Sequence, residues 1–164
     1  GRIVYAGGGI NPDVAVKADT IPIERARFQQ KLNNPIFSFA LDVIYGRSPE
    51  FIGYKVDKPI NFSYDLKPTD FVVNEKMYNA FKSFAVRNYS YTPEQIDGER
   101  TFVERALRSE FVTAAYGTTT SFQVFNEYDN QLMKAIELLP EAKQLAMEGA
   151  KAYRSSMGGL SNNR

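Results

Sequence analysis

The 164-residue chain contains no cysteine and no histidine, and each absence removes a class of chemistry. Without cysteine there can be no disulfide, thiolate nucleophile or zinc–thiolate site. Without histidine, the commonest general base and the commonest imidazole metal ligand are missing. Catalysis within this sequence would therefore depend on a Ser-Lys pair, on paired carboxylates or on a carboxylate-bound metal.

The sequence also lacks a long apolar run and an excess of charge of one sign. No run approaches the roughly 20 apolar residues needed to cross a bilayer, so we expect no membrane span. The chain has 20 basic and 19 acidic residues, and this balance provides no electrostatic footprint for nucleic acid. Hydrophobic residues make up 43% of the chain, which is enough for a packed core, and the length suits one domain.

The first seventeen residues predict a strand, a glycine turn and a second strand. Residues 2–6 are rich in strand formers, residues 7–9 are all glycine, and residues 13–17 alternate apolar and polar side chains. No helix start or Gly-Lys-Ser/Thr follows the glycines, so they predict a turn rather than a phosphate-binding loop. A lone hairpin is marginal in water, and its edges, residues 3–5 or 14–16, predict a possible homodimer.

Helical periodicity predicts most of the remaining chain. Residues 35–45 are apolar nearly all round, which predicts a buried central helix closed by Gly46; a buried strand pair is the alternative. We expect Asn34-Pro35 to separate this helix from one over residues 20–33. A capping box at Thr92 and Gln95 predicts another helix start. The further helices are expected at residues 74–88, 92–116, 118–128, 129–138 and 140–153.

The connection over residues 47–69 is the least regular part of the sequence. It holds three prolines with aromatic residues between them, and we expect it to be ordered and pinned by those aromatics. Alternation over residues 60–64 suggests a short strand there. The expected fold is mainly α, with about six helices and a small N-terminal β-hairpin, and the tail after Arg154 is expected to fray.

The first sixteen residues also carry a family resemblance. The pattern Gly-Arg-x-Val-Tyr-x-Gly-Gly-Gly-Ile-x-Pro-Asp-Val-x-Val resembles the stretch just after the catalytic core of carboxyl-terminal processing peptidases, the tail-specific serine proteases. The later helices, with Tyr-Thr-Pro-Glu at residues 91–94, resemble more loosely the helical C-terminal extension of some bacterial members. The resemblance implies that residues 1–19 end a peptidase core, residues 20–155 form a helical C-terminal domain, and residues 156–164 form a flexible tail.

The resemblance also implies what this portion does not carry. In the family the Ser nucleophile, its Lys activator and a PDZ-like domain all lie upstream of this segment, so no catalytic residue transfers to this chain. We expect no cofactor and no metal. The implied parent is an exported, periplasmic or cell-envelope endopeptidase that acts on protein or peptide substrates. The implied partner of this portion is its own catalytic core, which it would brace or whose substrate access it would shape; mediating self-association is the other implied role.

Two groups of residues could suggest chemistry within the chain, and both have simpler interpretations. Five carboxylates, at Glu94, Asp97, Glu99, Glu104 and Glu110, alternate with arginines, as is usual for a solvated helix face. Ser38 with Lys31, or Ser83 with Lys82, could form a Ser-Lys pair. Spacing alone establishes neither the hydrogen bond nor an oxyanion hole, so we assign no catalytic site.

The aromatic residues, 12 Phe and 10 Tyr, are the remaining candidates for a contact surface. Most fall on helical stripes and are expected in the core. The best surface candidates lie on turns and connections, because amphipathic aromatics are favoured at interfaces: Tyr54, Phe62, Tyr64, Tyr89 and Tyr91. The alternative to a peptidase domain is a stand-alone helical protein-interaction module; an enzyme with a carboxylate site is weaker still.

Overall fold

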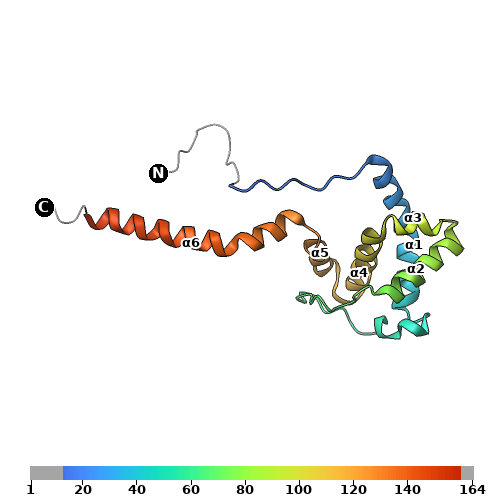
Figure 1. The fold of residues 1–164 in the computed structure, drawn as a ribbon. Helices are drawn as coiled ribbons and strands as arrows, with labels where there is room; N and C mark the ends of the chain where they lie inside the picture. The colour runs from blue at the N-terminus through green and yellow to red at the C-terminus, as the bar shows by residue number, and fades with distance from the viewer. Residues whose placement is uncertain (1–12, 160–164) are drawn as a thin grey trace. The chain divides into compact units, whose positions relative to one another are not determined.

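The computed structural model describes residues 13–159, with side chains up to Arg154. These residues divide into two units: residues 20–128 form one, and residues 13–19 with residues 129–159 form the other. The described part contains six α-helices, one 3₁₀-helix and no strand (Figure 1). The prediction of a mainly α fold is confirmed. The strand predicted over residues 2–6, the turn over residues 7–9 and residues 160–164 of the predicted tail lie outside the described residues, whereas residues 156–159 of that tail are helical.

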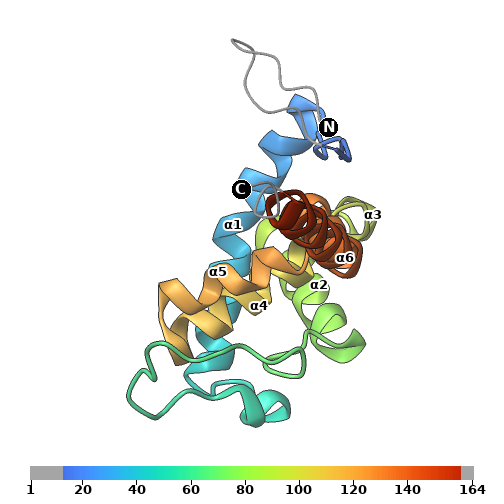
Figure 2. The same cartoon turned by 90° about the vertical axis from the view of Figure 1, so that its left-hand side faces the viewer.

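Three helices build the core of residues 20–128: α1 (Ile23–Ile44), α2 (Glu75–Tyr89) and α4 (Arg100–Tyr116). Helix α1 lies against both α2 and α4 (Figure 2), and the apolar stripe of each helix contributes buried residues to the shared core. Phe39 of α1 lies edge-on to Phe81 of α2, with ring centroids 5.7 Å apart. The fully buried side chains are Leu32, Ile36, Val43, Met77, Tyr78, Phe81, Ile96, Val103, Leu107, Phe111, Val112 and Val124.

Helix α1 runs straight through Asn34-Pro35, so the predicted break there is wrong. A proline inside a helix has no N–H for the carbonyl four residues earlier, which here belongs to Lys31. The Tyr91 hydroxyl donates a hydrogen bond to that carbonyl at 3.5 Å and supplies part of what the proline removes. Pro35 is itself buried, so packing also offsets its cost.

The helix starts around residues 74 and 92 follow the sequence signals closely. The Asn74 side chain accepts a hydrogen bond from the Met77 N–H and caps α2. Thr92 and Gln95 form the predicted capping box at the start of α3 (Pro93–Asp97). The helix predicted over residues 92–116 is nevertheless two helices, because the backbone leaves α-geometry at Glu99 before α4 begins.

The connection between α1 and α2 is ordered, as predicted. It begins with the 3₁₀-helix η1 (Pro49–Tyr54), and Tyr64 stacks on Tyr116 of α4 at 4.0 Å. The strand predicted over residues 60–64 is wrong, because the local backbone bonds to helices instead of to another strand. The Asn61 N–H donates to the Ala115 carbonyl at 3.1 Å, and the Tyr64 carbonyl accepts from Gln123 of α5 (Thr118–Asn126).

The second unit pairs one long helix, α6 (Asn130–Gly159), with the extended residues 13–19. The two helices predicted at residues 129–138 and 140–153 are one, and Pro140 lies inside it. On a solvent-exposed helix, water can bond the carbonyl that a proline leaves without a donor. The strand predicted over residues 13–17 is absent because no described strand lies beside it. Side-chain amides of Asn130 and Gln131 instead donate to the Lys17 and Val16 carbonyls, each at 3.1 Å.

Candidate functional site

The predicted surface aromatic Tyr54 belongs largely to the core. Its ring packs 5.4 Å from Phe111 and 6.1 Å from Phe71, and its hydroxyl donates to the Val72 carbonyl. Burial raises the pKa of this hydroxyl. Tyr54 therefore presents little of its ring to a partner, and its main role is to pin the connection against α4.

Phe62 and Tyr64 lie on the connection near the end of α4. Phe62 is 71% exposed, and the same ring lies beside Gly117. Tyr64 is half-buried by its stack on Tyr116, and burial raises its pKa to about 12, with the neighbouring Asp70 carboxylate adding to the rise. Phe62 is thus the only one of these two that presents most of its ring to solvent.

Tyr89 and Tyr91 lie together at the end of α2 and the turn that follows it. Their rings stack nearly parallel, with centroids 6.4 Å apart. The Tyr89 hydroxyl is 3.0 Å from the Ser38 hydroxyl on α1, and the Tyr91 hydroxyl reaches the Lys31 carbonyl on the same helix. The pair ties α1 to α2, and each ring keeps one partly exposed side.

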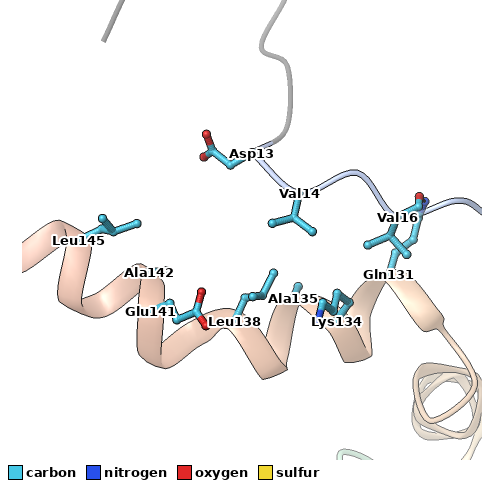
Figure 3. Close-up of a pocket in the computed structure, with 10 residues that line it drawn as sticks. All are labelled: Asp13, Val14, Val16, Gln131, Lys134, Ala135, Leu138, Glu141, Ala142 and Leu145. Atoms are coloured by element: carbon cyan, nitrogen blue, oxygen red, sulfur yellow. Dashed lines mark hydrogen bonds between the residues drawn. The ribbon is translucent and has the colours of Figure 1, made fainter. Parts of the chain in front are cut away.

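An apolar groove lies along the second unit, between residues 13–16 and the first half of α6 (Figure 3). Its volume is about 450 Å³. Val14 and Val16 point toward the helix, and Leu138 and Leu145 face them from α6. Polar groups stand only at the rim: Asp13, Gln131, Lys134 and Glu141. This arrangement suits apolar side chains of a partner and offers no centre for catalysis.

Helix α6 also exposes large apolar side chains along most of its length. On one face of the helix Lys134 pairs with Glu137 at 2.8 Å and Gln144 donates to Glu148. Around the rest of the helix, which also carries Lys143, large apolar side chains are at least half exposed at six positions: Met133, Ile136, Leu139, Leu145, Met147 and Tyr153. A helix that is apolar over so wide an arc is usually covered by another element or a partner.

The sequence predicted helices over residues 129–138 and 140–153 but not this groove. The signal was present in two spacings. Val14 and Val16 alternate with polar residues, while Ala135, Leu138, Ala142 and Leu145 recur every three or four residues. A strand-like and a helical stripe can face each other, but the sequence alone does not say that these two meet.

Neither Ser-Lys pair forms in the structure. The Ser38 hydroxyl bonds to Tyr89, and the Lys82 ammonium lies 2.9 Å from the Asp97 carboxylate. That ion pair and the Tyr78 hydroxyl lower the pKa of Asp97. Within the described residues, no group of three or more acidic side chains is placed to hold a metal ion.

The interpretation of the carboxylates as a solvated face holds for Glu104 and fails for Glu99. Glu104 pairs with Arg100 at 2.7 Å in the expected i,i+4 geometry. Glu99 is buried, and its two oxygens accept from Arg25 and Gln29 of α1, each at 2.6 Å. The side chain of Glu99 thus fastens the start of α4 to α1, which explains why the helix breaks there.

Comparisons of the chain with protein-family models, with curated protein sequences and with solved structures find no match. None of the helices in residues 13–159 combines the length and apolar content required to cross a membrane.

Proposed function

We propose that this chain is the helical C-terminal portion of an exported, serine-type carboxyl-terminal processing endopeptidase. In this role it binds the catalytic core, braces it and shapes substrate access, and it does not cleave peptides itself. The N-terminal resemblance supports the choice of parent. The observation that carries the proposal is the apolar surface formed by residues 13–16 and α6, because it offers a place to dock protein and holds no reactive group.

The backbone of the extended segment supports the same role. None of residues 14–19 exchanges a backbone–backbone hydrogen bond with another described residue. The Val16 and Lys17 carbonyls accept from side-chain amides, but an extended segment that forms no backbone ladder can still pair with a strand from a partner. The catalytic core of the implied parent would supply a sheet, so that the segment and the groove would be covered together.

A two-part reconstitution tests this proposal. The gene upstream of the Gly1 codon is first sequenced to find the Ser and Lys of the peptidase motif. The upstream polypeptide and the present chain are then produced separately and mixed, and hydrolysis of an unstructured protein is followed. We expect neither part alone to be fully active and the mixture to recover activity. Recovery should be lost with L138E/L145E and kept with the matched control E141Q, at the rim of the same groove.

Two outcomes would reject the proposal. One is robust hydrolysis by the present chain alone, surviving Ser38→Ala and Ser83→Ala. The other is an upstream reading frame that stops at once or lacks the peptidase motif.

The second candidate is a stand-alone helical interaction module, and the closed core of residues 20–128 favours it. Leu32, Phe81 and Phe111 are fully buried within that unit, so it needs no outside partner to be covered. In this case deletion of residues 1–17 should lower the melting temperature, because the segment would pack only on its own chain. Self-association through the extended segment would appear as concentration dependence in sedimentation; a monomer at all concentrations would count against it.

A further inference from the structure

A second groove, within residues 20–128, lies between α2 and the end of α1 with η1. Its volume is about 480 Å³, within the range of pockets that hold ligands. Helix α2 forms one wall, η1 and the residue before it form the other, and Phe39 lies at the base. Polar side chains on its two walls are Glu50, Lys76, Asn79, Ser83 and Arg87.

The base of this groove is aromatic and fixed. Phe39 lies 5.5 Å from Phe84 and 6.5 Å from Phe51, measured between ring centroids. Phe39 and Phe51 are almost wholly buried and hold the partly exposed Phe84 ring in place, so Phe84 is the aromatic surface that the groove offers. One apolar side chain of a ligand could therefore rest on a surface that is already formed, which reduces the ordering cost of binding.

The wall formed by α2 carries a cation at each end. Lys76 and Arg87 are eleven residues apart on the same face, which places them about 16 Å apart along the helix axis. The Lys76 ammonium lies over the Phe51 ring at 5.5 Å, and neither cation is held by a carboxylate of the described residues. Glu50, on the opposite wall, is the one acidic group that lines the groove.

We propose that this groove binds an extended, acidic polypeptide segment with an apolar residue between two carboxylates. In an extended chain, residues i, i+2 and i+4 point to the same side, and i and i+4 are about 13 Å apart. Two acidic side chains at that spacing can reach Lys76 and Arg87 while the middle side chain rests on Phe84. Ser83 and Asn79 lie between the cations, where they can bond the peptide backbone, and Glu50 can accept from a peptide N–H.

The test uses the full chain labelled with ¹⁵N and the peptide acetyl-Glu-Thr-Leu-Thr-Glu-amide. We expect the amide signals of Ala80, Ser83 and Phe84 to shift on titration. Two matched peptides separate the contributions: Glu-Thr-Ser-Thr-Glu lacks the apolar side chain, and Lys-Thr-Leu-Thr-Lys reverses the charges. Both should bind more weakly. The variant K76E/R87E changes exposed residues, and we expect it to weaken binding at least about tenfold with an unchanged circular dichroism spectrum.

R27E serves as the control variant, because Arg27 is an exposed arginine on α1 that does not line the groove. It should bind the peptide like the parent chain. The proposal is overturned if the acidic peptide shifts none of the three signals, if the basic peptide binds equally well, or if K76E/R87E binds as the parent does. An equal response to sodium sulfate alone would reduce the groove to a general anion site and would also reject it. The test concerns residues 39–87 only and does not depend on the proposed peptidase parent.

Discussion

Substitution of Arg108 should be among the most destabilising polar changes in this protein. Arg108 lies in α4 and is 6% exposed. Its guanidinium donates to the Asp70 carbonyl at 3.0 Å, to the Lys67 carbonyl at 3.1 Å and to the Glu127 carboxylate. One side chain thus joins the connection before α2, the middle of α4 and the residue that follows α5.

The magnitude can be worked from these contacts. A hydrogen bond to a charged group contributes about 1.5–3 kcal/mol to stability, and Arg108 makes two to backbone carbonyls in addition to its ion pair. Water can replace part of this at partly buried carbonyls, so we expect Arg108→Ala to lower the free energy of unfolding by about 3 kcal/mol. Arg108→Lys keeps the positive charge but loses the planar guanidinium group that donates to two carbonyls at once, so it should lower the free energy of unfolding by about 2 kcal/mol.

Glu127 provides the matched comparison. Glu127→Gln removes the charge but keeps a side-chain oxygen that can accept from Arg108, and at a side chain that is 37% exposed water already screens the ion pair. This substitution should therefore cost no more than about 1 kcal/mol. Urea unfolding should show a lower midpoint and an unchanged slope for each variant. The reasoning is refuted if Glu127→Gln costs as much as Arg108→Lys, or if Arg108→Met, which keeps volume and removes the donors, is as stable as the parent.

Three further predictions follow from single contacts. Gly117 has φ +84°, and an added Cβ would lie 3.1 Å from the Phe62 ring, so Gly117→Ala should lower the free energy of unfolding by about 1–3 kcal/mol. Thermal melting measures this loss, and Phe62→Ala in the same chain should recover only the part that is due to the clash with the ring. Tyr91→Phe should lower the free energy of unfolding by under about 1 kcal/mol, because it removes one hydrogen bond to the Lys31 carbonyl. In a chain that also carries Pro35→Ala the loss should be smaller, because residue 35 then has an N–H for that carbonyl. Equal losses with Pro35 and with Ala at position 35 would contradict the role given to Tyr91. Hydrogen bonds from Lys82 and then from Tyr78 lower the folded-state pKa of Asp97. The ionised carboxylate therefore stabilises the fold above its unfolded pKa, and this stabilisation is lost as the pH falls through the folded pKa. Unfolding followed by circular dichroism should show Asp97→Asn to be less stable than the parent chain at neutral pH and equally stable at the acid end.

The sequence predicted the helices best where a local signal was complete. Asn74, Thr92 and Gln95 marked real helix starts because capping involves only residues within one turn. Gly46 and Gly117 marked real ends, and both adopt positive φ. Such signals depend only on residues that are close together in the sequence, so the sequence is enough to recognise them.

Predictions failed where the deciding contact came from far along the chain. Pro35 would break an isolated helix, and the residue that compensates, Tyr91, is sixty positions away from the carbonyl that it bonds. The sequence predicted that Glu99 lies on a solvated helix face, because its partners, Arg25 and Gln29, lie on another helix far away in the sequence. The burial of Tyr54 has the same cause: it lies on a connection, yet Phe71 and Phe111 pack against its ring.

The contact between residues 13–17 and α6 has a consequence for how the chain opens. Asn130 reaches the Lys17 carbonyl across 113 positions of sequence, so this weak contact closes a very long loop. In an unfolded chain, closing such a loop carries an entropy cost that two amide hydrogen bonds and a few apolar contacts do not repay. The contact is therefore expected to be lost whenever residues 20–128 unfold, and cleavage at residues 13–19 by an added protease should become faster when that unit is destabilised.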